Sequence, residues 1–149
     1  MAEYIATSLQ TVPLNSPINW TASIPCRRGM IVHEDETGIF ILRGCTDQCF
    51  AQYQVTFNGN VSLPEGSDIV PVALALAVNG EPRPSSLAIF TPQAVDEFGN
   101  LTSTAIIRVP KGCCFTLSVE HVPATTDPTV TPAPVINVQN ANLVISRIA

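Results

Sequence analysis

Segments in which apolar and polar residues alternate recur along the chain at intervals of about a dozen residues. The clearest, CFAQYQVTF at residues 49–57, places Ala51, Tyr53, Val55 and Phe57 on one face and polar residues on the other. A period of two is typical of a strand with one buried face. The pattern therefore predicts a strand with these four side chains in the core.

Turn signals separate these segments. Asn58-Gly59 and Asn79-Gly80 favour positive backbone φ, so each predicts a tight turn that ends the strand before it. The run LTSTAIIRV leads through Pro110-Lys111-Gly112 into CCFTLSVEH, which predicts a hairpin of two neighbouring strands. Together with PINWTASI and GIFILRG, this spacing predicts an all-β, two-sheet sandwich of about eight to ten strands.

Two segments carry apolar residues on both faces. Residues 70–78 (VPVALALAV) have large side chains on one face and alanines on the other, and residues 136–149 (INVQNANLVISRIA) are also apolar on both faces. Such strands are buried on both sides, so we expect central positions in a sheet. The small or apolar second face could meet a neighbouring subunit. The candidate interface residues are Ala73, Ala75, Ala77, Leu143, Ile145 and Arg147.

One segment, residues 122–135 (VPATTDPTVTPAPV), is of low complexity. Its four prolines cannot donate the hydrogen bonds of a regular sheet, so it predicts an extended, exposed loop. An exposed loop rich in hydroxyl groups is a natural contact surface. The candidate contact residues are Thr125, Thr126, Asp127, Thr129 and Thr131.

Charge is scarce. Charged residues make up 13% of the chain, which leaves much of the surface uncharged and favours burial against other subunits. The formal net charge of −5 and the scattered basic residues argue against a nucleic-acid partner. No apolar run approaches the roughly 20 residues of a membrane span, and the start MAEYIATSLQ has no leader pattern. We therefore expect a soluble protein made in the cytoplasm, with no membrane partner.

The five cysteines cannot all pair within one chain, so at least one is free. None of the paired two-residue spacings of a zinc site occurs. We expect buried free thiols. A disulfide bond between Cys45 and Cys49 is the alternative in an oxidising environment.

Other polar clusters give weak signals for chemistry. The run from His33 to Glu36 predicts a solvated acidic turn, and a calcium loop at Glu34–Glu36 stays open as the alternative. His33 and His121 lie far apart in sequence, and neither a nucleophile elbow nor a phosphate-binding loop occurs. Trp20 favours a core or interface position over a sugar-binding platform. We expect no enzyme activity, no cofactor and no metal.

The order of strands resembles a known group of proteins. From about Gly29 to Ala149, the segments ALAVNG, VPKGCCFTLSVE and NANLVISRIA are similar to the tumour necrosis factor and complement globular-head superfamily of jelly rolls. More closely, they resemble small virion proteins in bacteriophages and prophages of gut Firmicutes. The resemblance covers most of the chain and marks no active site.

The resemblance implies a homotrimer whose subunits pack their inner sheets about a threefold axis. Its relatives serve as capsid decoration or head-fibre modules, so the implied function is that of a virion structural protein with other capsid proteins as partners. Residues 1–25 would form an N-terminal arm and first strand that dock onto a partner or neighbouring subunit, and residues 26–149 the jelly-roll domain. Two alternatives stay open: a module that binds a host surface glycan or protein, and a bacterial spore or cell-surface trimer.

Overall fold

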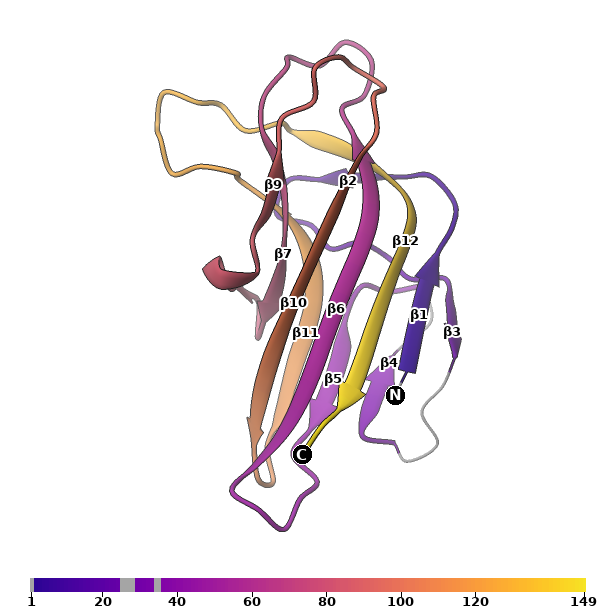
Figure 1. Cartoon of the computed structure of the whole chain (residues 1–149), viewed down its shortest axis with the longest axis vertical. Coiled ribbons are helices and arrows are strands. Elements are labelled where there is room, and N and C mark those ends of the chain that lie inside the picture. The colour runs from indigo at the N-terminus through magenta and orange to yellow at the C-terminus, as the bar shows by residue number, and fades with distance from the viewer. Residues whose placement is uncertain (1, 25–28, 34–35) are drawn as a thin grey trace.

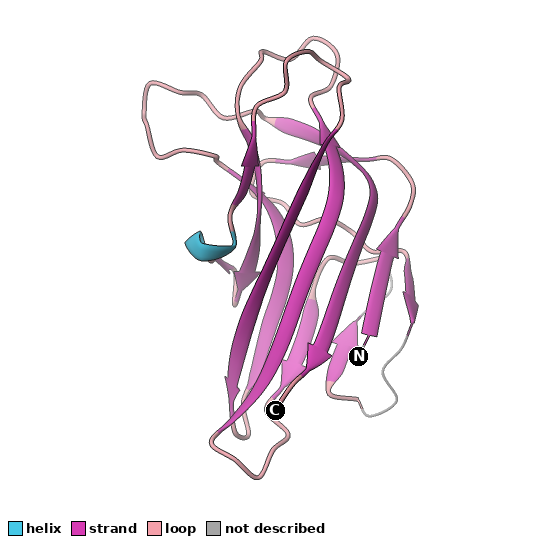
Figure 2. Cartoon of the chain, viewed as in Figure 1, coloured by secondary structure: helices cyan, strands magenta, loops and turns pink. Residues whose placement is uncertain are grey.

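The computed structural model describes residues 2–24, 29–33 and 36–149. Over these residues the chain folds into two antiparallel sheets that pack face to face (Figure 1). The only helical element described is one short turn, the 3-10 helix η1 at Pro84–Ser86, as Figure 2 shows. The prediction of an all-β, two-sheet jelly-roll sandwich is therefore confirmed.

The front sheet, which faces the viewer in Figure 1, has the order β10-β6-β12-β1-β3, with β2 pairing with the first four residues of β12. Its long strands β6 and β12 pair along most of their lengths, interrupted by a bulge between Gln139 and Asn142. The C-terminal strand is central in this sheet, as its sequence predicted. The strands are β1 (Ala2–Ala6), β2 (Gln10–Pro13), β3 (Ala22–Ile24), β6 (Phe50–Ser62), β10 (Gly99–Pro110) and β12 (Val135–Arg147).

The back sheet has the order β4-β5-β11-β7-β8, with β9 also pairing with β7. Several of its strands have only two to four residues. Counting these short strands brings the described total to twelve, above the eight to ten expected, because short pairings leave little pattern in the sequence. The strands are β4 (Ile31–His33), β5 (Phe40–Arg43), β7 (Val72–Val78), β8 (Glu81–Pro82), β9 (Ala88–Phe90) and β11 (Cys114–Val122).

The core lies between the two sheets. Ala51, Tyr53, Val55 and Phe57 of β6 are at most 1% exposed, which confirms the inward face predicted for this segment. Trp20 is also fully buried, so its core interpretation is confirmed. Alternation thus decides which side of each strand faces the partner sheet.

The predicted hairpin around Pro110-Lys111-Gly112 is wrong. β10 pairs with β6 in the front sheet, whereas β11 pairs with β5 and β7 in the back sheet. The turn occurs where predicted, with Gly112 at φ +77°, but it carries the chain from one sheet to the other. Both strands are amphipathic, so they can face each other across the core as well as pair edge to edge.

The two Asn-Gly signals have different outcomes. Asn79 and Gly80 have φ values of 53° and 82°, as the predicted turn requires, and they join β7 to β8. Asn58-Gly59 instead lies inside β6, which continues to Ser62, so this predicted turn is wrong. A Cβ on Gly59 would lie 3.3 Å from the Cβ of Ala141, beside the bulge in β12. This glycine permits close strand packing.

The N-terminal segment pairs with both sheets of its own chain. β1 lies between β12 and β3 within the front sheet of its own chain. The chain then pairs with the back sheet, where Ile18 N–H donates to the Val119 carbonyl at 2.8 Å. Residues 2–24 therefore join the two sheets, and the predicted boundary at residue 25 separates two parts of one sandwich.

Candidate functional site

The loop between β11 and β12 extends from the sandwich, as its proline content predicted (Figure 1). Its candidate contact residues, Thr125, Thr126, Asp127, Thr129 and Thr131, are all exposed. The loop has local order, because the Asp127 carboxylate accepts hydrogen bonds from the backbone N–H of Thr129 at 2.9 Å and from its hydroxyl at 2.8 Å. These two bonds lower the pKa of Asp127.

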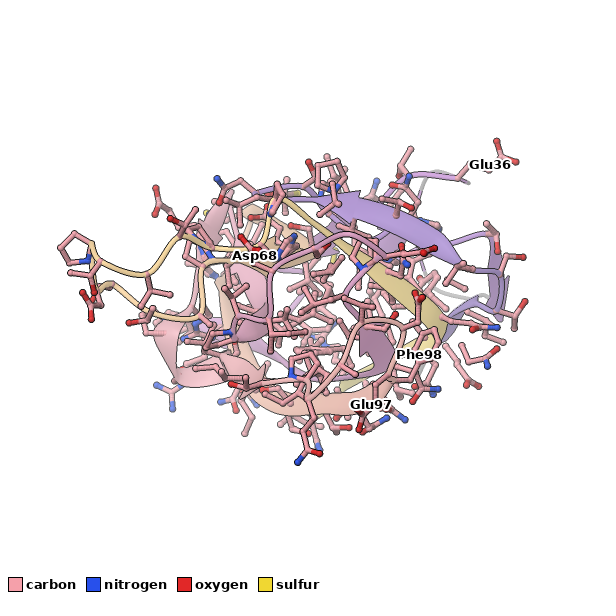
Figure 3. All side chains as sticks on the ribbon, turned by 90° about the horizontal axis from the view of Figure 1, so that it is seen from above. Glu36, Asp68, Glu97 and Phe98 are labelled. Carbon is pink, nitrogen blue, oxygen red and sulfur yellow. The ribbon has the colours of Figure 1, made fainter. Side chains whose placement is uncertain are left out.

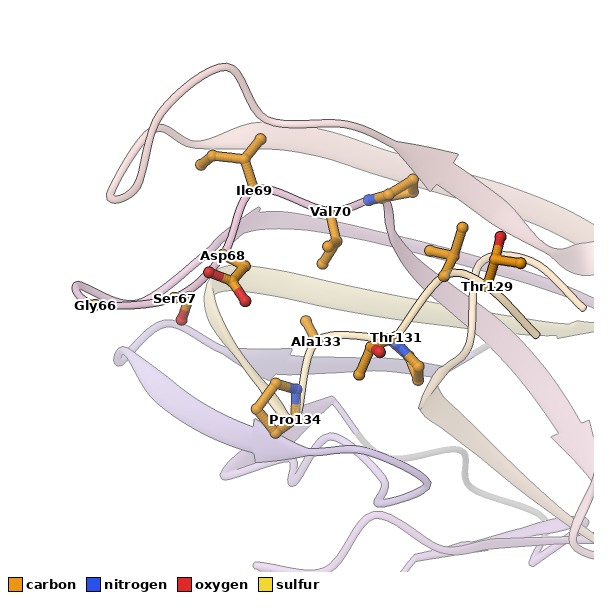
Figure 4. Close-up of a pocket in the computed structure, with 12 residues that line it drawn as sticks. Gly66, Ser67, Asp68, Ile69, Val70, Thr129, Thr131, Ala133 and Pro134 are labelled. Carbon is orange, nitrogen blue, oxygen red and sulfur yellow. The ribbon is translucent and has the colours of Figure 1, made fainter. Parts of the chain in front are cut away.

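A groove of about 570 Å³ lies between this loop and the β6–β7 connection (Figure 4). One wall is Gly66–Pro71 and the other is Thr129–Pro134, two segments that are distant in sequence. The groove combines the hydroxyls of Ser67, Thr129 and Thr131 with the carboxylate of Asp68 and several prolines. Such a lining can donate and accept hydrogen bonds against a partly apolar wall.

Exposed charged and apolar side chains also lie at this end of the molecule. Figure 3, which looks onto this end, shows Asp68 on one side and Glu97 with Phe98 on another, whereas Glu36 lies far out on the rim. Phe98 is 47% exposed and Ile69 46%. The sequence pattern does not predict either exposed side chain, because no alternation marks an apolar residue in a connecting loop.

The outer face of the front sheet carries an uncharged polar surface, which we call the Asn/Thr face. Hydrogen bonds link its side chains across strands: the hydroxyls of Thr56 and Thr104 lie 2.9 Å apart, and the Asn100 side-chain amide donates to Oδ1 of Asn58. Such cross-strand bonds hold the side chains in fixed positions. The face is defined by outward residues of β6 and β10, namely Gln54, Thr56, Asn58, Asn100, Thr102 and Thr104.

The two strands of this face and their neighbour β12 have very few charges. β6 has no charged residue, and β10 and β12 have one arginine each, Arg108 and Arg147. Ile106, beside Arg108, is 52% exposed. Charged residues are the ones that usually keep a surface in water, and they are depleted in the cores of protein interfaces.

Five of the six predicted interface residues are buried within their own chain, which corrects the prediction for these five. Ala73, Ala75 and Ala77 are at most 1% exposed, because the outer side of β7 is covered by the same chain. Leu87, Val122 and Ala124 belong to this cover. Leu143 and Ile145 are fully buried and belong to the core, while Arg147 is partly exposed at the end of β12. Apolar residues on both faces of a strand correctly indicated that both faces are buried. The second face, however, is covered by the same chain and not by a neighbouring subunit.

The thiols also differ from expectation. The four described cysteines, Cys45, Cys49, Cys113 and Cys114, are free and exposed, so the prediction of buried thiols is wrong for them. Among residues 2–24, 29–33 and 36–149, no three His, Cys, Asp or Glu side chains gather as metal ligands would. Glu34 and Asp35, which belong to the calcium alternative, lie outside the described residues.

The two histidines occupy different positions in the sandwich. His121 is buried, and its Nδ1 donates a hydrogen bond to the Val12 carbonyl at 3.1 Å. Burial lowers the pKa of this imidazole below its usual value. His33 stacks on Phe40 with ring centroids 4.4 Å apart, and its Nε2 donates to the Thr37 carbonyl. Both rings are held by backbone carbonyls.

Comparison with solved structures identifies the fold. The chain is similar to the globular domain of the zebrafish complement 1qA protein, with a TM-score of 0.57 and 12% identity over 96% of this chain and 94% of that one. It is similar to the tumour necrosis factor Eiger from S. frugiperda, with a TM-score of 0.62 and 11% identity over 100% and 92% of the two chains.

No protein-family model matches the sequence, and no curated protein matches it either. The likeness therefore concerns the fold, which is a jelly-roll sandwich of the tumour necrosis factor and complement 1q type. In the described part of the chain, no helix is long and apolar enough to cross a bilayer.

Proposed function

We propose that this protein is a non-catalytic structural module that assembles as a homotrimer through the Asn/Thr face. The observation that carries the proposal is the near absence of charge on the outer side of three long strands of a small acidic protein. The resemblance of the strand order to trimeric jelly rolls, noted above from the sequence, supports three as the number of subunits.

Two properties of the face support this role. Its side chains already bond to one another, so packing against another subunit would cost little conformational entropy. Its amide and hydroxyl groups also form hydrogen bonds without the desolvation cost of a charge. Exposed Ile106 and half-buried Val144 add apolar area at positions on β10 and β12.

Native mass spectrometry and light scattering test the assembly. The wild-type chain is expected at three times its 15.9 kDa mass. The double variant Thr56→Lys and Thr104→Lys places two cations on each face, where like charges would meet about the axis, and is expected to be a folded monomer. A trimer that tolerates both lysines would contradict the proposed interface.

Thr116→Lys is the matched control. Thr116 is an exposed β11 residue that pairs with Ile41, on the outer side of the back sheet. The same type of substitution there adds one lysine to a strand residue of the other sheet, against two in the double variant. It is expected to leave the trimer intact, and circular dichroism should show the same fold for all three proteins.

As the biological setting we propose the surface of a bacteriophage particle, where the trimer would decorate the capsid or form part of a head fibre. The resemblance of ALAVNG, VPKGCCFTLSVE and NANLVISRIA to small virion proteins supports this setting. Mass spectrometry of phage particles released from the encoding host should detect the chain. Genes for capsid and portal proteins should lie beside its gene. Its absence from purified particles would contradict this setting.

A second candidate function is recognition of a host surface glycan. It is favoured by the groove beside residues 122–135, which we call the Thr/Pro loop. Asp68 and the nearby hydroxyls could bond to sugar hydroxyl groups. A glycan array is expected to give hits that disappear in Asp68→Asn, while Asp47→Asn, on an exposed loop residue at the other end, retains them. An array without hits would contradict this function and leave the trimer proposal unaffected.

A further inference from the structure

A pocket of about 500 Å³ opens on one side of the sandwich, between β10 of the front sheet and the ends of β7 and β11 in the back sheet. β10 is the last strand of its sheet, so only one of its two sides pairs with a neighbour, β6. We call this pocket, lined by residues 106–108 with Val78, Arg83 and Phe115, the edge pocket. It shares no residue with the groove beside the Thr/Pro loop.

The inner wall of the edge pocket is apolar. Ile107 of β10 is only 2% exposed, and Val78 and Phe115 are partly buried and pack against the core between the sheets. These three side chains come from three different strands. An apolar group that entered the pocket would leave water and lie against them. The pocket can therefore hold the apolar part of a ligand.

Two arginines line the same pocket. Arg83, which directly precedes η1 at the left of Figure 1, donates from Nη1 to the Ile106 carbonyl at 3.1 Å, so its guanidinium lies against the free edge of β10. A guanidinium has five N–H donors, so one bond leaves others available. Arg108 is exposed, and among the described residues its side chain has no hydrogen-bond or ion-pair partner. Both arginines can therefore donate to a ligand.

The charge of the edge pocket is opposite to that of the whole chain. No aspartate or glutamate lines it, whereas the formal net charge of the chain is −5. The described ranges contain five basic residues, of which the first two named here line the pocket: Arg83, Arg108, Arg43, Lys111 and Arg147. Guanidinium groups form short, charge-assisted hydrogen bonds with carboxylates. A carboxylate beside an apolar group would use both parts of the pocket.

We propose that the edge pocket binds a short acidic peptide segment of a partner protein. One apolar side chain of the segment lies against Val78, Ile107 and Phe115, and a neighbouring carboxylate accepts hydrogen bonds from Arg83 and Arg108. Because Arg108 is exposed at the mouth, the pocket is open on one side. A small free acid would keep part of its surface in water there, whereas small-molecule sites bury most of their ligand. A peptide continues beyond the pocket, which favours it as the occupant.

The edge pocket adjoins the Asn/Thr face without belonging to it. That face ends at Gln54 and Thr104, and the pocket begins one alternate position further along the same strands, at Gln52 and Ile106. Its other residues come from the back sheet and from Arg83, which do not contribute to the face. The inference therefore adds a ligand site to the proposed subunit contact and goes beyond the proposed function.

Fluorescence anisotropy on the full chain tests the site. The probe is a labelled peptide with one Asp-Phe pair flanked by glycine and serine residues. Control peptides carry Asn-Phe, which removes the charge, or Asp-Ala, which removes the apolar side chain. Saturable binding of the Asp-Phe peptide is expected, with affinity about tenfold lower for each control. Raising the salt concentration should weaken binding, because salt screens exposed ion pairs.

Arginine variants assign the binding to the edge pocket. Arg108→Gln and Arg83→Gln are each expected to lower the affinity for the Asp-Phe peptide about tenfold, because each removes a charge-assisted hydrogen bond. Arg43→Gln is the matched control, since it removes the same charge from an exposed strand residue that does not line the pocket. It should bind like the wild type, and circular dichroism should show the same fold for all four proteins.

Several results would overturn the proposal: no saturable binding, equal binding of the Asn-Phe peptide, or wild-type affinity in Arg108→Gln. Octanoate has a carboxylate and an apolar chain but no peptide backbone, so octanoate that binds more tightly than the peptide would overturn the choice of occupant. Light scattering on the same samples reports the trimer separately. A monomer that binds the peptide would contradict only the proposed function, and a trimer that does not bind it would contradict only the edge pocket.

Discussion

β6 and β7 are consecutive strands, one in each sheet, yet their outer faces differ. The outer side of β7 carries Ala73 and Ala75, and its own chain covers them with Leu87 and Ala124. The outer side of β6 carries Thr56 and other uncharged polar groups. The apolar second face of β7 is therefore buried within the chain, whereas the uncharged polar face of β6 is the one at which we propose a partner subunit.

The largest effect is expected for a charge beneath the cover of β7. Ala75→Glu would bury a carboxylate opposite Glu120, which pairs with Ala75, so the new charge would be unpaired and repelled. We expect a loss of about 4 kcal/mol or more in the free energy of unfolding. Urea unfolding measures this, with Thr56→Glu as the partly exposed counterpart on β6 that retains the fold. If the two variants were equally stable, the outer faces of β6 and β7 would not differ in burial.

Removing the cover itself should have a smaller effect. Leu87 is partly buried and packs against the alanines of β7. Leu87→Ala deletes this apolar contact and is expected to cost about 2 kcal/mol in the free energy of unfolding. Chemical denaturation checks the value, and Leu9→Ala, at a 55% exposed leucine, is the control. A cost no larger than that of the control would show that the cover contributes little.

The buried His121 tests the contact between the two sheets. Its lowered pKa means that the unfolded chain takes up a proton before the folded one does. Stability is therefore full above the ordinary histidine pKa of about 6.5 and falls as the pH drops from there toward the folded pKa. The slope from this group cannot exceed about 1.4 kcal/mol per pH unit.

Urea unfolding between pH 7.5 and 5.5 should show this loss, and His121→Gln should reduce it. The variant removes the titrating group and leaves an amide that can donate to Val12. An identical pH dependence in the two proteins would mean that other groups cause it.

The smallest effect is expected in the Thr/Pro loop. Thr131→Ala changes an exposed residue in the wall of the groove and should alter the free energy of unfolding by less than about 0.5 kcal/mol. A larger loss in the same urea titration would show that the loop supports the fold instead of serving only as a surface.

The sequence predicted features that depend on near neighbours. Alternation placed Ala51 to Phe57 correctly, and Asn79-Gly80 forms its turn because both residues tolerate positive φ. The proline-rich loop is exposed because its prolines cannot donate the hydrogen bonds of a regular sheet. These are local properties of the chain, so a short window of residues contains the information.

Features that depend on distant segments were not predictable. The turn at Pro110-Lys111-Gly112 looks the same whether the next strand joins the same sheet or crosses to the other. Likewise, the residues that cover Ala75 lie beyond its own strand, and the two walls of the groove are about sixty residues apart. Alternation of apolar and polar residues identifies a buried strand face but does not identify the residues that cover it.

The mass of the assembled protein tests the central claim most directly. Light scattering on the eluting wild-type protein, across a tenfold range of concentration, should give three times the 15.9 kDa chain mass at every point. The Thr56→Lys and Thr104→Lys double variant should give a single chain mass under the same conditions. A wild-type protein that elutes as a monomer or a dimer throughout would contradict the proposal that the Asn/Thr face forms a trimer.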